Sequence, residues 1–137
     1  MLERINHLGY AVESVEAASD FYKVSFGVEA GASETVEEQG IVARMFRVGD
    51  SMIELIEPTH PDSPVGRFLA KRGEGFHHVA FEVGDIGATL AALKKHGVEL
   101  VDSEPKVGAG GALTAFIHPK GAFGVLTELV ELPDRGR

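Results

Sequence analysis

The sequence contains HLGYAVESV at residues 7–15 and HVAFEVGDI at residues 78–86. After each histidine, aliphatic, small, aromatic and aliphatic residues recur in the same order, at an offset of 71 residues. The match continues through two further pairs of segments: residues 26–29 and 96–99 (FGVE and HGVE), and residues 52–57 and 126–131 (MIELIE and LTELVE). Self-similarity of this kind indicates two copies of one module in a single chain.

Each copy predicts a strand, then a helix, then further strands. Residues 4–12 alternate as a half-buried strand does, and Ser14 is a typical N-cap for a helix through Phe26 that ends at Gly27. In the second copy Asp85 is the corresponding cap. The remaining predicted elements are strands at 44–49, 51–57, 112–118 and 124–132, and a connecting helix at 65–72.

This order predicts an α+β fold made of two tandem βαβββ modules. We expect the modules to be related by a pseudo-twofold axis, with mixed sheets that curve around a metal-binding cleft. A length of 137 residues fits one domain. The first module is expected at about residues 4–58, the connector at 59–75 and the second module at about 76–132 of the domain 1–137.

Composition excludes several classes of protein. Hydrophobic residues make up 44% and charged residues 25%, which is typical of globular chains rather than disordered ones. The absence of cysteine excludes disulfides, thiolate metal sites and a cysteine nucleophile. A net charge of −8 disfavours nucleic acid and anionic membranes as partners. The sequence has no signal-peptide pattern and no apolar run of the ~20 residues that a membrane helix needs, so a cytoplasmic location is expected.

Four residues occupy equivalent places in the two copies: His7, Glu54, His78 and Glu128. A buried histidine or glutamate is unfavourable unless it is paired or bound to a metal, and here both types recur in register. Two imidazoles and two carboxylates suit Mn, Fe, Co, Ni or Zn with an open position for water or substrate. His77 points to the opposite face of its strand and has no equivalent in the first copy.

At these residues the chain resembles the vicinal oxygen chelate (glyoxalase/bleomycin resistance/dioxygenase) superfamily, and within it the methylmalonyl-CoA epimerase family. The resemblance covers nearly the whole chain. The segments most specific to the epimerase branch are Glu38-Gln39-Gly40 and His118-Pro119-Lys120. The strand-borne histidines and glutamates are shared across the superfamily.

The resemblance implies a metal-dependent isomerase that interconverts (2R)- and (2S)-methylmalonyl-CoA. His7, His78 and Glu128 match the family's metal ligands, and Glu54 falls where the family has Gln or Glu. One divalent ion per chain is implied, without a choice among Co, Mn, Ni and Zn. The ion would stabilise an enolate while a proton leaves and returns at C2. A homodimer is also implied.

Inversion at C2 needs acid/base groups on both faces of the planar intermediate. Glu38 is the first candidate base, because its Glu-Gln-Gly segment matches the epimerase family. Glu128 is the candidate for the opposite face, and Gln39 a candidate for hydrogen bonding to the substrate carboxylate. Lys106 and Lys120 are candidate contacts for the CoA phosphates in this acidic chain, together with the connector cations Arg67, Lys71 and Arg72.

Two other functions remain open from the residues alone. A glyoxalase I-type lyase or isomerase would use the same ligand set. A metal-free small-molecule-binding protein of the superfamily would need none of the four ligands. An extradiol dioxygenase is disfavoured, because it would need two histidines and one carboxylate at a single iron rather than a second complete pair.

Overall fold

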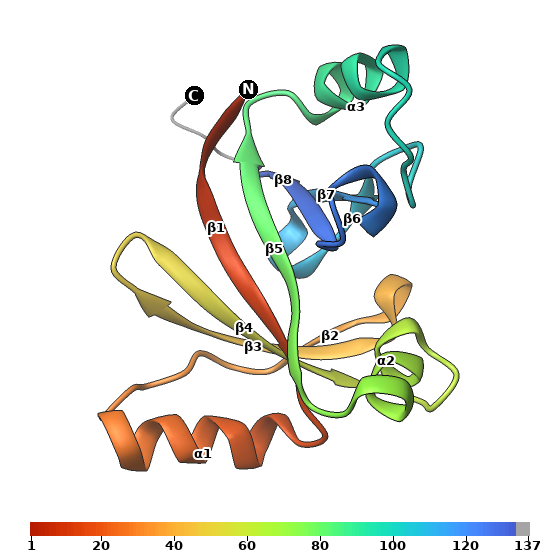
Figure 1. Cartoon of the computed structure of the whole chain (residues 1–137). Coiled ribbons are helices and arrows are strands. Elements are labelled where there is room, and N and C mark those ends of the chain that lie inside the picture. The colour runs from red at the N-terminus through yellow and green to blue at the C-terminus, as the bar shows by residue number, and fades with distance from the viewer. Residues whose placement is uncertain (134–137) are drawn as a thin grey trace. The chain divides into compact units, whose positions relative to one another are not determined.

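The protein divides into two compact units in the computed structural model, which describes residues 1–133 (Figure 1). The first unit is residues 7–77. The second combines residues 1–6 with residues 78–133 of the described chain. Strand β1, Leu2–Ala11, therefore contributes its first residues to one unit and its last residues to the other.

The first unit has the predicted strand and helix order. Its elements after β1 are α1 (Val15–Phe26), β2 (Glu34–Val36), the 3₁₀ turn η1 (Glu37–Gln39), β3 (Ile41–Val48), β4 (Ser51–Pro58) and α2 (Pro64–Arg72). The strand order is β2-β3-β4-β1. Strands β2, β3 and β4 pair antiparallel, whereas β1 pairs parallel with β4.

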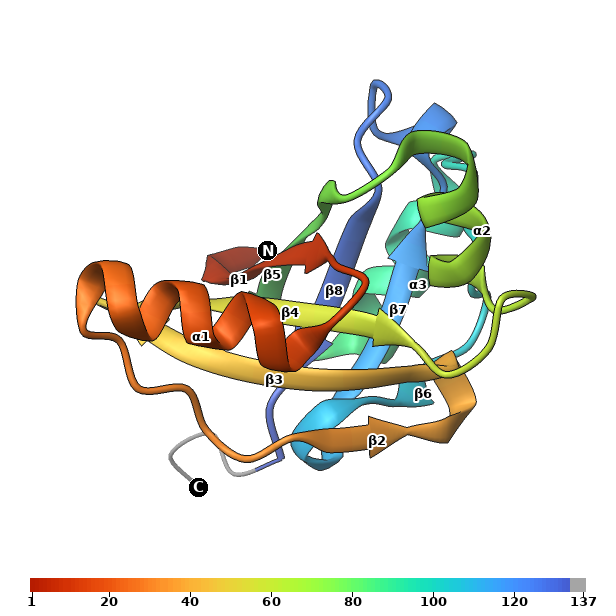
Figure 2. The ribbon, with the colours of Figure 1, turned by 90° about the horizontal axis from the view of Figure 1, so that it is seen from below.

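Helix α1 begins and ends where the sequence predicts. The Ser14 side chain accepts a hydrogen bond from the Ala17 amide, and Gly27 ends the helix in the left-handed conformation. The helix lies along β3 and β4 (Figure 2), where Val15 packs with Phe46 and Leu55. This core fixes β4, the strand that carries Glu54.

The second unit repeats the same order. It contains β5 (Gly75–Val83) from residue 78 on, because the first three residues of that strand fall in the first unit. Its further elements are α3 (Ile86–Lys95), β6 (Lys106–Val107), η2 (Ala109–Gly111), β7 (Leu113–Ile117), η3 (Pro119–Gly121) and β8 (Thr127–Glu131). The strand order is β5-β8-β7-β6, and β5 pairs parallel with β8. Val83, Ile86, Leu90 and Leu129 form a core between α3 and the strands. The α+β class and the two βαβββ modules are thereby confirmed.

Residues 1–6 belong to the second unit through a buried carboxylate. Glu82 is 4% exposed, and its Oε2 accepts a hydrogen bond from Asn6 Nδ2 at 2.9 Å. The Nε of Arg4 lies 3.5 Å from Glu82 Oε1. These contacts satisfy a buried charge that would otherwise be unfavourable, and they join the start of the chain to β5.

The strand bounds differ from the prediction at the ends. Strand β3 begins at Ile41 instead of residue 44, and β8 begins at Thr127 instead of residue 124. The second difference has a local cause. Residues 119–125 form turns, in which backbone amides donate hydrogen bonds to the carbonyls of Pro119 and Ala122. Phe123 adopts φ 55° there, a conformation incompatible with a strand.

Loss of the α3 cap is expected to destabilise the second unit. The Asp85 carboxylate accepts a hydrogen bond from the Ala88 amide at 2.9 Å. Asp85→Ala should lower the free energy of unfolding by about 1 kcal/mol, measured by urea denaturation. Asp85→Asn retains an acceptor and should stay within a few tenths of a kcal/mol of the wild type. Equal losses in both variants would contradict the capping role.

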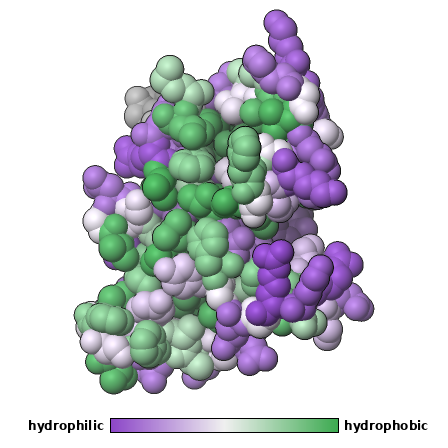
Figure 3. All heavy atoms as spheres, viewed as in Figure 1, coloured by the Kyte–Doolittle hydropathy of each residue, from purple (hydrophilic) through white to green (hydrophobic). Residues whose placement is uncertain are grey.

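Apolar side chains are exposed on the later part of α1. Phe21 is 55%, Val24 79% and Phe26 68% exposed, and hydrophobic residues gather at this end of the helix in Figure 3.

In the described part of the chain, no helix has the length and apolar character needed to span a bilayer.

Candidate metal and catalytic site

His7 and Glu54 form a buried pair in the first unit. Gly9 of β1 is opposite Glu54 of β4 in the parallel ladder, and His7 lies two residues before Gly9 on the same face. The imidazole therefore reaches Glu54 diagonally, with His7 Nε2 3.2 Å from Glu54 Oε1.

His78 and Glu128 form the equivalent pair in the second unit. Here Ala80 of β5 is opposite Glu128 of β8, and His78 again precedes the small residue by two. His78 Nε2 lies 3.0 Å from Glu128 Oε1. The ring of Phe116 on β7 meets the His78 ring edge-on, with centroids 5.3 Å apart, and so helps to fix its orientation.

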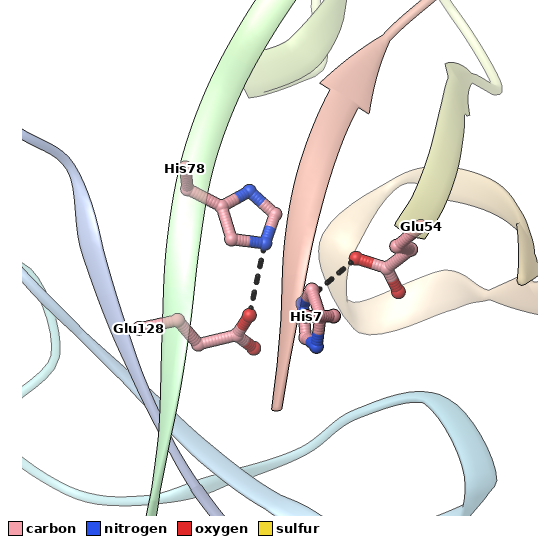
Figure 4. A group of neighbouring side chains, drawn as sticks. All are labelled: His7, Glu54, His78 and Glu128. Atoms are coloured by element: carbon pink, nitrogen blue, oxygen red, sulfur yellow. Dashed lines mark ion pairs between the residues drawn. The ribbon is translucent and has the colours of Figure 1, made fainter. Parts of the chain in front are cut away.

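Both pairs are withdrawn from solvent. The side chains of His7 and Glu54 are 5% and 7% exposed, and those of His78 and Glu128 are 3% and 5% exposed. Figure 4 draws each pair with its short nitrogen–oxygen contact dashed. Each of the four residues offers one nitrogen or carboxylate oxygen as a possible metal ligand. Burial of carboxylates beside imidazole nitrogens is the arrangement that a divalent cation stabilises.

Glu38 lies outside these pairs, in the 3₁₀ turn η1 between β2 and β3. It is exposed, and the following Gln39 is partly buried. Ile41, which starts β3, is opposite Pro58 at the end of β4, four residues beyond Glu54. Four residues of a strand span about 13 Å, so the η1 turn lies next to the end of β4 and not beside Glu54.

Lys106 is already paired within the second unit. Its Nζ lies 3.1 Å from Oδ1 of the buried Asp102, whose Oδ2 accepts the Phe116 amide at 2.8 Å. The Lys120 side chain is exposed in η3, and its amide donates to His118 Nδ1. Lys120 therefore presents its charge to solvent, whereas the charge of Lys106 is partly neutralised.

The connector cations lie on or next to the surface of α2. Arg67, Lys71 and Arg72 are all exposed. The Arg72 guanidinium lies 5.7 Å from the centre of the Phe68 ring, and that ring contacts His77. His77 thus packs against α2, away from the ligand role, as its place in the alternation predicts.

One tyrosine pKa is shifted, and the shift belongs to the core of the first unit. Burial raises the pKa of Tyr22, and the neighbouring Tyr10 raises that pKa further. The Tyr22 ring packs against Phe46 with centroids 4.8 Å apart. Tyr22 is therefore a neutral packing residue.

Sequence reasoning missed two contacts near the candidate residues. The Phe116–His78 ring contact joins β7 to β5, and Gly40 lies against Ser63 of the connector. Neither has a local signal. The repeat does align Phe116 with Met45, since each is opposite the glutamate of its own unit.

The chain belongs to the Glyoxalase/Bleomycin resistance protein/Dioxygenase superfamily, whose pattern matches residues 6–116. Among similar proteins of known structure, a methylmalonyl-CoA epimerase in complex with methylmalonyl-CoA and NH4+ is 41% identical, with a TM-score of 0.93. That match covers 97% of this chain and 96% of the other, so the two proteins share one fold.

Two curated relatives are also named as methylmalonyl-CoA epimerases. The ethylmalonyl-CoA/methylmalonyl-CoA epimerase of Cereibacter sphaeroides is 37% identical over 96% of this chain and 100% of its own length. The mitochondrial methylmalonyl-CoA epimerase of Homo sapiens is 37% identical over 93% of this chain and 73% of its own length.

Proposed function

We propose that this chain is a metal-dependent epimerase that interconverts (2R)- and (2S)-methylmalonyl-CoA by proton transfer at C2. The observation that carries the proposal is its 37–41% identity, over nearly the full chain, to proteins that bear the name of this activity. The two buried His/Glu pairs supply the donor chemistry that the reaction needs.

We assign one divalent ion per chain to His7, Glu54, His78 and Glu128. The fit rests on the donor set, because two neutral nitrogens and two carboxylate oxygens suit borderline divalent ions such as Co, Mn, Ni and Zn. Its repetition in the same register in both modules also supports the assignment. When bound, such an ion would supply Lewis-acid stabilisation of the negative charge that develops on the thioester oxygen.

The proton transfer is assigned to Glu38 and Glu128. In one direction the Glu38 carboxylate takes the C2 proton, and the electrons of the broken C–H bond pass to the thioester carbonyl to give a planar enolate. Glu128 in its protonated form then donates a proton to the opposite face of C2 and is left as a carboxylate. Proton exchange with solvent returns Glu38 to the carboxylate and Glu128 to the acid. Exposure of Glu38 supports a role at an accessible face rather than in the core.

Substrate contacts are assigned to Gln39, Lys106 and Lys120. The partly buried Gln39 directly follows Glu38, which suits an amide that orients the substrate carboxylate. The exposed Lys120 is available for a phosphate of CoA. Lys106 would need to share its charge between the substrate and Asp102. A homodimer and a cytoplasmic location remain predictions. Sedimentation equilibrium would test the homodimer by measuring the mass of the protein in solution.

The relatives favour this function over the alternatives. A glyoxalase I-type enzyme shares the ligand types but acts on a thiohemiacetal instead of a malonyl thioester. A metal-free binding protein would have no use for two buried His/Glu pairs. The proteins described above are named as epimerases.

The experiment that tests the proposal follows deuterium at C2. In deuterated buffer, the protein with a divalent ion should exchange the C2 proton of either methylmalonyl-CoA epimer and convert one epimer to the other. Removal of the ion by a chelator should suppress both processes, and adding the ion back should restore them.

The control substrate is a methylglyoxal–thiol adduct, which suits the lyase alternative. We expect turnover of the malonyl thioester and not of the adduct. Comparable or faster turnover of the adduct would replace the proposal with the lyase function. Absence of deuterium at C2 with the metal-loaded protein would refute any proton-transfer role.

A further inference from the structure

The turn that carries Glu38 is short. Residues Glu37–Gln39 form a single 3₁₀ turn whose glutamates are exposed. Gly40 ends the turn at φ 66° and ψ 37°, and its amide donates to the Glu37 carbonyl at 3.1 Å. A single 3₁₀ turn is not stable by itself, so contacts with other parts of the chain must hold it in position.

Gly40 supplies that placement by lying directly against the connector. Its carbonyl accepts a hydrogen bond from the Thr59 amide at 2.9 Å. A Cβ added at Gly40 would lie 3.0 Å from the Cβ of Ser63. The left-handed φ disfavours a side chain at this position, and so does the close approach.

Ser63 is a rigid partner for this approach. The residue is 2% exposed, and its hydroxyl donates to the His60 carbonyl at 2.8 Å while accepting the Gly66 amide at 3.1 Å. Gly66 is equally constrained, because a Cβ there would lie 2.5 Å from the Pro61 carbonyl oxygen. Ser63 therefore cannot yield easily to a larger neighbour, and a substitution at Gly40 must displace the η1 turn instead.

We propose that Gly40 is a positioning residue that fixes Glu38 by clamping the η1 turn against Ser63 and Thr59. The inference deepens the proposed function and rests on it, since it concerns the placement of the base. Gly40 has no side chain, so it can neither transfer a proton as an acid or base nor bind the substrate through a side-chain group. Its effect on the reaction runs through Glu38.

The test compares two glycines with the same backbone conformation. Gly27 has φ 68° and nothing within 4 Å of an added Cβ, whereas Gly40 has φ 66° and the Ser63 contact. Gly40→Ala and Gly27→Ala therefore introduce similar backbone strain, and only the first introduces the collision. We expect Gly40→Ala to lower kcat for epimerisation roughly 10- to 100-fold, with KM and metal content unchanged. Gly27→Ala should retain the wild-type kcat.

A second substitution should relieve the collision. Adding Ser63→Gly to Gly40→Ala removes the opposing Cβ and should recover most of the lost kcat, although the helix loses its Ser63 cap. In a Glu38→Gln background, Gly40→Ala should cause no further loss, because the base it positions is already absent.

Amide hydrogen exchange tests the clamp without measuring activity. Gly40→Ala should accelerate exchange at Thr59, whose amide bonds to the Gly40 carbonyl, and Gly27→Ala should not. Unchanged exchange at Thr59 would overturn the clamp. Faster exchange with a wild-type kcat would overturn the positioning role. A wild-type protein that does not epimerise would refute the proposed function while the exchange experiment still judged the clamp.

Discussion

A His78→Ala variant is expected to lose its divalent ion and to epimerise methylmalonyl-CoA at least about a thousandfold more slowly than the wild type. The substitution removes the Nε2 that lies 3.0 Å from Glu128 Oε1. The His78 side chain that carries this atom is only 3% exposed. Lewis-acid stabilisation contributes several kcal/mol, and each 1.36 kcal/mol changes the rate tenfold. Metal analysis of the dialysed protein and the deuterium assay measure the two losses together.

The matched control is His96→Ala. His96 is an exposed histidine of the same unit, at the end of α3, and its Nδ1 contacts the Ala92 carbonyl. This variant should retain the ion and the activity. His7→Ala should behave as His78→Ala does, because the two histidines occupy the same register. Full metal occupancy in either ligand variant would disprove the four-ligand assignment.

Glu38→Gln is expected to keep the metal and the melting temperature and to lose roughly 10²- to 10⁴-fold in epimerisation, the usual contribution of one general base. Glutamine keeps the size and hydrogen bonding of the side chain but cannot accept the C2 proton. The exposed position of Glu38 makes a stability change small, so a rate loss would reflect chemistry.

Glu37→Gln is the control for this prediction. It removes the same charge from the adjacent exposed residue of the same turn. Its epimerisation should stay near the wild-type rate. A two-base mechanism further predicts that Glu38→Gln retains C2 exchange with solvent for the epimer whose proton faces Glu128. Epimerisation by Glu38→Gln at the wild-type rate would move the base to Glu128 or to a bound hydroxide.

Local signals explain why much of the fold could be predicted from the sequence. Ser14 and Gly27 mark the two ends of α1 through hydrogen bonds to residues close in sequence, and Asp85 marks the start of α3 in the same way. The repeat singled out the four residues of the two buried His/Glu pairs, because the same register in two modules can be seen without knowledge of tertiary contacts.

Contacts between distant residues explain what could not be predicted. The approach of Gly40 to Ser63 depends on where the connector returns after β4, which no short pattern specifies. The same holds for the Phe116 ring beside His78. The pairing of Lys106 with Asp102 spans only four residues, but these residues are not helical, so the spacing alone does not predict the contact.

The division of β1 between the two units has a consequence for the order of folding. Residues 7–77 are contiguous, so the first unit has all of its chain while the rest is still being synthesised. The second unit needs residues 1–6, and its Asn6–Glu82 hydrogen bond closes a separation of 76 residues. Contacts of such high contact order form slowly, because loop-closure entropy precedes their gain. Residues 1–6, which are synthesised before the first unit, therefore complete a unit whose other strands are synthesised after it, and this unit stays incomplete, with unpaired strands prone to aggregation, until the two segments meet.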